Sequence, residues 1–248
     1  MIRLIRAEFT KLATTRLLYS MGATMAAFAV LTVVAGIAYA GREGNPALSA
    51  DSLPMLVGLP VTLLSGAALL LGILGMTGEF RHQTVTQTFL VTPNRGRVVT
   101  AKLVAYPLAA IALALSILAF TAALATGWLA AKGITLSLLD ARLGHVLLGA
   151  VLAAGLCGLV GVGVGALVRN QVAALVGVAV WVLLVEGLLM SLLNAPSLGK
   201  WLPSAAAAAL TNPGGAQLSR LAGTLLLASY GLALALAGTR LVVRRDIT

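Results

Sequence analysis

Residues 76–102, MTGEFRHQTVTQTFLVTPNRGRVVTAK, form a long polar and basic segment in the middle of an otherwise apolar chain. Five of its groups carry or can carry positive charge, against the single carboxylate of Glu79; these are Arg81, His82, Arg95, Arg97 and Lys102. An arginine or lysine at the centre of a bilayer costs roughly 2.5–3.5 kcal/mol, so the segment must lie outside the hydrocarbon. Long apolar runs on both sides hold it at the membrane surface, and its positive charge indicates the cytoplasmic side.

The spacing of residues within this segment predicts a short helix from Phe80 to Val91. No glycine or proline interrupts that stretch, and Val85 and Phe89 lie four residues apart on one apolar stripe. Pro93 disfavours helical geometry at the residue before it, so we expect a break, with residues 94–96 as a turn before the next helix. The threonine-rich residues 84–88 also fit a strand, but a lone strand with open edges beside a membrane is disfavoured.

The composition of the chain identifies a multi-span membrane protein. Of its 248 residues 60% are hydrophobic and 10% charged, and the mean hydropathy is +1.02, whereas soluble domains carry about 25% charged residues. The net charge of +10 gathers at the ends of apolar runs and aromatic residues make up only 5%, so anionic lipid headgroups and a cytoplasmic partner explain the charge better than nucleic acid does. The single cysteine, Cys157, excludes an intrachain disulfide.

We therefore expect an all-α fold in one transmembrane domain, residues 1–248, with six membrane-spanning helices. Residues 2–16 place Ile2, Ile5, Phe9 and Leu12 on one helical face, which predicts a basic amphipathic helix in the interface at about residues 1–16. Residues 38–40 resemble a signal-peptidase site, but the apolar run before them is too long for a signal peptide. Residues 195–220, broken by prolines, predict short outer or re-entrant helices. The expected spans cover residues 17–40, 53–76, 103–131, 143–168, 172–193 and 221–243.

The distribution of positive charge predicts that both termini are cytoplasmic. With six spans, the inner segments contain twelve of the seventeen lysine and arginine residues: Arg3, Arg6, Lys11, Arg16, Arg81, Arg95, Arg97, Lys102, Arg169, Arg240, Arg244 and Arg245. The outer segments contain the other five: Arg42, Lys132, Arg142, Lys200 and Arg220. Positive residues concentrate on the cytoplasmic side of membrane proteins, which supports this orientation.

The sequence gives little sign of catalytic chemistry. It has no G-x-x-x-x-G-K-[ST] loop for nucleotide phosphates, no convergent nucleophile and base, and two histidines at opposite membrane faces, so we expect no cofactor, no metal and no enzyme activity. Gly161, Gly163 and Gly165 lie inside an apolar span, where close helix packing explains them better than dinucleotide binding. Glu186 is a carboxylate in the outer half of the fifth span. It is either a pathway residue or a hydrogen-bonded packing residue, and the sequence does not favour one over the other.

A set of motifs along the chain resembles the ABC-2-type permeases, the membrane subunits of ATP-binding-cassette exporters. The basic segment carries Gly78-Glu79-Phe80-Arg81, Thr84, Thr92-Pro93-Asn94-Arg95 and Ala101-Lys102, similar to the first cytoplasmic loop of that family. The N-terminal residues 6–12, RAEFTKL, resemble its elbow helix. Six spans, the tight turn at Arg169, the proline-broken outer segment and the terminal Arg244-Arg245-Asp246 also fit.

The resemblance implies a dimer of permeases, with a second copy or a paralogue, around a pathway driven by two copies of a separate ATPase. It also implies a coupling helix in the first inner loop, between spans two and three, and location in a bacterial cytoplasmic membrane. The expected coupling residues are Glu79, Phe80, Arg81, Thr84, Val85, Phe89, Pro93, Arg95 and Lys102. Val85 and Phe89 would anchor the partner, and Glu79, Arg81 and Arg95 would form a charged rim. The expected elbow residues are Ile5, Glu8, Phe9 and Lys11.

Two other functions are compatible with the sequence. A regulatory or lipid-handling subunit of such a complex would share the same fold without pumping. A secondary transporter would use Glu186 as a proton or cation site, but such proteins show related halves or several intramembrane carboxylates, and neither is evident here.

Overall fold

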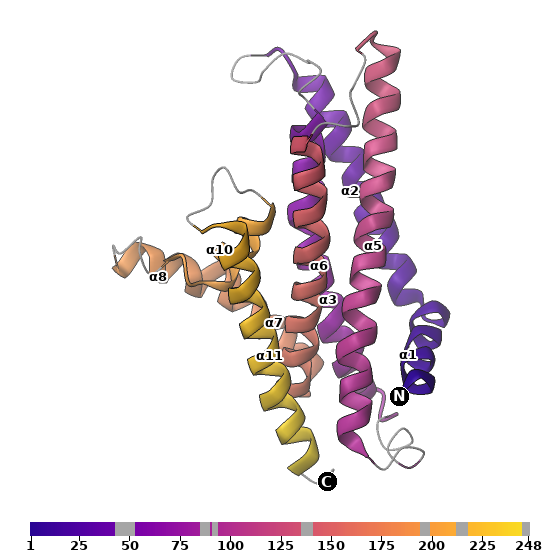
Figure 1. Cartoon of the computed structure of the whole chain (residues 1–248), viewed down its shortest axis with the longest axis vertical. Coiled ribbons are helices and arrows are strands. Elements are labelled where there is room, and N and C mark those ends of the chain that lie inside the picture. Colours follow the sequence, from indigo (N-terminus) through magenta and orange to yellow (C-terminus); the bar gives the residue numbers. More distant parts are fainter. Residues whose placement is uncertain are drawn as a thin grey trace.

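The structure is a computed structural model that describes residues 1–42, 53–84, 90, 94–134, 141–193, 199–211 and 218–244. Within these ranges the chain is helical and contains no strand. Figure 1 shows an elongated bundle with both termini at the same end. Six helices among the described residues are long and apolar enough to cross a membrane, which confirms the predicted all-α fold with six spans; they are Arg16–Tyr39, Leu63–Arg81, Arg95–Ala131, Leu143–Val168, Gln171–Leu192 and Arg220–Leu241.

The first half of the chain forms four helices: α1 (Ile2–Thr14), α2 (Arg16–Tyr39), α3 (Leu53–Arg81) and α5 (Arg95–Ala131). A separate helix therefore precedes the first span, because the extended backbone of Thr15, at φ −87° and ψ 145°, divides α1 from α2. The 37 residues of α5 span about 56 Å at 1.5 Å per residue, whereas the hydrocarbon core is about 30 Å thick. This helix therefore extends well beyond the hydrocarbon.

The second half contains α6 (Ala141–Val168), α7 (Gln171–Val180), the π-helical segment η2 (Trp181–Val185), α8 (Glu186–Leu193), α10 (Pro203–Thr211) and α11 (Arg220–Arg244). The fifth span is continuous through α7, η2 and α8, but Figure 1 shows α8 leading away from the axis of the bundle. A π-helical turn is a known cause of such bends. The nine-residue helix α10 confirms the short helix predicted between the prolines of residues 195–220.

Helix α6 lies at the centre of the bundle and uses glycines on two faces. A Cβ at Gly161 would lie 2.1 Å from the carbonyl oxygen of Leu69 on α3, so the two backbones touch. A Cβ at Gly163 would lie 2.8 Å from the Cβ of Leu234 on α11. Small residues allow such close approach between helices in a membrane. The prediction that these glycines serve helix packing is confirmed.

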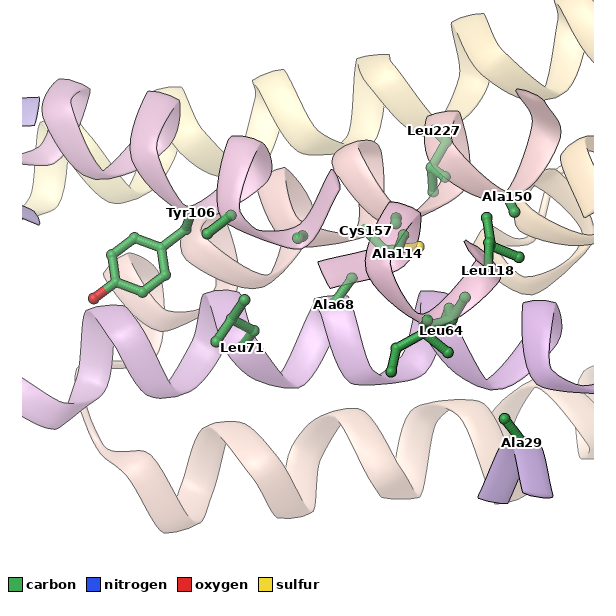
Figure 2. Packing of buried hydrophobic residues seen from close by; sticks show 14 of the residues in the cluster. Ala29, Leu64, Ala68, Leu71, Tyr106, Ala114, Leu118, Ala150, Cys157 and Leu227 are labelled. Atoms are coloured by element: carbon green, nitrogen blue, oxygen red, sulfur yellow. The ribbon is translucent and has the colours of Figure 1, made fainter. Parts of the chain in front are cut away.

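The rest of the core follows the same rule, because small side chains fill the contacts between helices. Ala68 of α3, Ala114 of α5 and Ala150 of α6 are almost completely buried. Figure 2 shows Ala68, Ala114 and Cys157 between the helices, with Tyr106 at one end of the row. Cys157 is a free, buried thiol inside this apolar cluster. The helices thus approach one another closely along most of the bundle.

Two predicted boundaries around the basic segment are wrong. Phe80 does not begin a new helix, because α3 continues through Arg81 and the chain leaves the helix at Gln83, whose φ is 56°. Helix α5 begins at Arg95, two residues earlier than predicted, because the Asn94 side chain accepts a hydrogen bond from the backbone N–H of Arg97, at 3.2 Å, and caps the helix. Val85 and Phe89 of the predicted coupling helix, and Pro93 after it, lie outside the described residues.

Candidate functional site

Four charged side chains form a closed ring at the end of the bundle that holds both termini. Lys102 Nζ lies 2.6 Å from Glu8 Oε2 and 2.9 Å from Glu79 Oε1, while Lys11 Nζ lies 2.7 Å from Glu79 Oε1 and 2.9 Å from Glu8 Oε1. Two ammonium groups thus alternate with two carboxylates, and the ring has no net charge. We call Glu8, Lys11, Glu79 and Lys102 the ion ring. It joins α1 to the end of α3 and the start of α5.

The local helical geometry brings each member of the ion ring into place. Glu8 and Lys11 are three residues apart on α1 and so lie on one face of the helix. Leu12, next to Lys11, is buried like Glu8. Glu79 lies in the last turn of α3, and Lys102 lies two turns into α5. The ring closes because α1 packs against α5 and the Lys11 side chain reaches Glu79 at the end of α3.

Lys102 is the most deeply placed member of the ring, with only 1% of its side chain exposed. Its ammonium group donates to Glu8, to Glu79 and, at 3.3 Å, to the carbonyl oxygen of Gly75, so all three of its N–H bonds have acceptors. A buried ammonium that is both paired and fully hydrogen-bonded avoids most of the cost of losing water. Lys102 is therefore a structural charge inside the protein.

An aromatic ring covers the ion ring from the membrane side. Lys102 Nζ lies 5.3 Å from the centre of the Tyr106 ring, within the range of a cation–π contact. The same ring lies against Gly75, where a Cβ would come within 1.8 Å of the Tyr106 Cε1 atom. Gly75 thus makes room for the ring and supplies a carbonyl to Lys102, so no larger residue fits there.

Lys11 is the half-exposed member of the ring and borders its outer side. Burial acts to lower the pKa of Lys11, but its hydrogen bonds to Glu79 and Glu8 and the charges of these two carboxylates outweigh that effect and raise the pKa above its ordinary value of 10.5. A raised lysine pKa favours the charged form in the folded state. Its contribution to stability is complete below about pH 10.5 and is lost as the pH rises through the folded-state pKa.

A second set of contacts between helices, at the same end of the bundle, involves Arg169 in the turn between α6 and α7. Its backbone has φ 58°, and its guanidinium group donates to the carbonyl oxygen of Leu241 on α11. The same group lies 5.9 Å from the centre of the Phe80 ring on α3. The next residue, Asn170, caps α7 by accepting from the backbone N–H of Ala173 at 3.0 Å. The tight turn predicted at residues 169–171 is confirmed.

A cavity of about 640 Å³ lies beside the ion ring. Its walls come from the α1–α2 junction, the end of α3, Tyr106 of α5 and the first residue of α7. The lining residues are Lys11, Leu12, Thr15, Leu17, Leu74, Gly75, Gly78, Glu79, Arg81, His82, Thr84, Tyr106 and Gln171. The volume falls within the usual range of small-molecule sites.

Glu186, the carboxylate predicted inside the fifth span, lies away from the ion ring. It follows the π-helical segment, is 4% exposed, and accepts a hydrogen bond from Trp181 Nε1 at 2.9 Å and another from the Ser204 hydroxyl on α10. Both carboxylate oxygens thus have donors from this chain. This is the hydrogen-bonded packing arrangement, and a role of Glu186 in a pathway stays a prediction.

The structure brings together some of the predicted site residues and separates others. Glu79 and Lys102, expected in a coupling surface, pair with Glu8 and Lys11, expected only in the elbow helix. Arg81 and Thr84 border the cavity, and Phe80 is half-buried beneath Arg169. Arg95 is the first residue of α5.

The predicted apolar face of α1 is divided in the structure. Ile5 and Leu12 pack toward the bundle, whereas Ile2 and Phe9 are 83% and 37% exposed. The bundle-facing side also carries Glu8, because the ion ring requires its carboxylate there. A separate, amphipathic N-terminal helix is therefore present, and its position in the membrane interface stays a prediction.

Sequence reasoning missed the ion ring and the cavity. One signal for the ring was available: the chain has only seven acidic residues, and just three of them, Glu8, Glu79 and Asp246, fall in segments predicted to be cytoplasmic. Isolated carboxylates among so many cations are candidates for specific ion pairs. No pattern in the sequence indicated the cavity, because its walls come from five helices.

No family model and no curated protein matches the chain.

Proposed function

We propose that the chain is the permease subunit of an ATP-driven exporter, working as a dimer with a separate ATPase. The observation that carries the proposal is the ion ring. A permease without a nucleotide-binding loop depends on a partner that moves some rigid part of it. The connection between α3 and α5, which would receive that partner, is flanked by Glu79 on one side and Lys102 on the other, and both pair with α1.

Through the ion ring, a movement of the α3–α5 connection would displace α1, α3 and α5 together. A displacement of the α3–α5 connection changes the positions of Glu79 and Lys102, and the ion ring transmits the change to α1 and so to the first span. Breaking buried ion pairs is costly, so the four charges move together more readily than they separate. The six spans and the motif order of residues 78–102 are consistent with the same proposal.

The experiment is affinity purification of the tagged full chain from its native membranes at low ionic strength. We expect a protein with a G-x-x-x-x-G-K-[ST] loop to purify with it in stoichiometric amount and to hydrolyse ATP. Phe89→Ala, which removes the proposed apolar anchor, should reduce ATPase recovery roughly thirtyfold, since a central aromatic anchor contributes 2 kcal/mol or more. Phe120→Ala is the matched control, because Phe120 is an exposed phenylalanine in the middle of α5.

Two results would overturn the proposal. One is equal ATPase recovery with Phe89→Ala and wild type, together with a lowered melting temperature of Phe89→Ala, which would place that ring in the interior. The other is transport in vesicles that needs an ion gradient and no ATP. In that case loss of transport in Glu186→Gln would indicate a secondary transporter.

A further inference from the structure

The charged residues of the cavity beside the ion ring differ in whether they are paired. Of its charged lining residues, Lys11 and Glu79 belong to the neutral ion ring, where each contacts two opposite charges. The exposed side chain of Arg81 is different. Within the described ranges it makes no ion pair, and its hydrogen bond, at 3.3 Å, goes to the uncharged Oε1 atom of Gln171. Arg81 therefore gives the mouth of the cavity a positive charge, beside the imidazole of His82.

The opposite part of the cavity is apolar. Leu74 lies seven residues before Arg81 on α3, about 10 Å along the helix toward the middle of the span. Leu12 and Leu17 line the side formed by the α1–α2 junction. The cavity thus combines a cationic mouth at the end of the bundle with an apolar wall that extends along the span.

We propose that this cavity binds an anionic amphiphile, with its phosphate group at Arg81 and the beginning of its acyl chain along Leu12, Leu17 and Leu74. The planar guanidinium group suits the oxygens of a phosphate, which it can contact with two parallel hydrogen bonds. Gln171 holds that group at the mouth of the cavity. A purely inorganic anion would leave the apolar wall unused, whereas a phospholipid of the inner leaflet satisfies both parts. The inference concerns a ligand of the chain itself and does not depend on an ATPase partner.

The experiment titrates the purified full chain, in a zwitterionic detergent, with short-chain phospholipids below their micelle concentration, and measures bound molecules by native mass spectrometry. The probes are dihexanoyl phosphatidylglycerol, dihexanoyl phosphatidylcholine and inorganic phosphate. We expect the phosphatidylglycerol to bind at least tenfold more tightly than either of the others. Arg81→Gln should weaken its binding about tenfold. Arg81→Lys keeps the positive charge but loses the planar guanidinium group with its paired N–H donors, and should weaken binding less.

Two control variants separate the site from general effects. Arg3→Gln removes one positive charge from exposed α1 at the same end of the bundle, outside the cavity, and should leave binding unchanged. Gln171→Ala removes the hydrogen bond of Arg81 but keeps its charge, and should change binding by less than Arg81→Gln does. The melting temperature of each variant reports whether the fold is intact.

Each contrary result has a definite meaning. Equal binding of the two phospholipids, which both carry a phosphate, would exclude a role for the net negative charge of the lipid. Inorganic phosphate that binds as tightly as phosphatidylglycerol would show a simple anion site. An equal loss in Arg3→Gln and Arg81→Gln would show diffuse attraction by surface charge, and an equal loss in Gln171→Ala would show a structural effect. Any of the four overturns the proposed site.

Discussion

Lys102 is a buried cation whose partners come from three helices. It contacts carboxylates of α1 and α3 and a backbone carbonyl of α3, and the Tyr106 ring of its own helix covers it. Because the ammonium group is almost fully buried, its energetic role differs from that of a surface ion pair. Surface pairs contribute about 0–1 kcal/mol, whereas the loss of one partner from a buried pair leaves an uncompensated charge and costs far more.

Replacing Lys102 with methionine should therefore destabilise the protein by about 3–5 kcal/mol, because two carboxylates then share only Lys11. Unfolding of the purified protein by heat or denaturant measures the change. Lys132→Met is the matched control, since Lys132 is exposed at the other end of α5, and we expect a change within about 0.5 kcal/mol. Equal stability of Lys102→Met and Lys132→Met would contradict the role of the ion ring.

The sequence predicted which charged residues lie near the membrane surface, but not which of them form ion pairs with one another. The basic segment predicted that Glu79 and Lys102 are close to the membrane surface, and the structure places Glu79 in the last turn of α3 and Lys102 two turns into α5. Glu8 is 94 residues away from Lys102 along the chain, and Lys11 is 68 residues away from Glu79. A helical periodicity shows which residues share a face, but not which neighbouring helix that face meets. For this reason Glu8 was expected only as part of an amphipathic elbow.

At the scale of the helices, glycines set the distances within the bundle. Gly161 on α6 touches the backbone of α3, and Gly163 on the other face touches α11. A side chain at either position would push two helices apart, since the neighbouring atoms are backbone or Cβ atoms that have no other rotamer. The pattern was visible in the sequence as G-x-G-x-G, whereas the identity of the two neighbouring helices was not.

Gly161→Ala should destabilise the protein by about 1–3 kcal/mol, the usual cost of overpacking. Its added Cβ would lie 2.1 Å from a carbonyl oxygen of Leu69, so α3 and α6 must separate. Gly127→Ala is the matched control within α5, because no atom lies within 4 Å of the added Cβ, and alanine is the better helix former. The melting temperatures of the two variants test this difference. A Gly161→Ala variant as stable as Gly127→Ala would contradict the close contact.

At the scale of the whole molecule, the bundle has two distinct ends. Figure 1 shows both termini at the end where α3 finishes and α5 begins, while α5 finishes at the opposite end of the bundle. The count of six spans requires this arrangement, and so the sequence was sufficient to predict it. The bend of the fifth span at η2 was not predictable, because residues 171–193 read as one uninterrupted apolar helix.

The orientation in the membrane gives a direct prediction. In a Cys157→Ala background, a cysteine at Asn94 should react with an impermeant thiol reagent only from the cytoplasmic side. A cysteine at Lys132 should react only from outside. Both positions are exposed and lie at opposite ends of α5, which makes them a matched pair. Labelling of both from one face of the membrane would contradict the six-span topology.

The ion ring also sets an order of events during synthesis. Lys102 emerges 94 residues after Glu8, which at about 5–20 residues per second corresponds to roughly 5–19 s. During that interval the nearest opposite charge to Glu8 is Lys11, three residues later on the same helix. Until then, the Glu8 carboxylate of the N-terminal helix can pair only with Lys11. The contact between this helix and Lys102 can form only after the start of the third span has been synthesised.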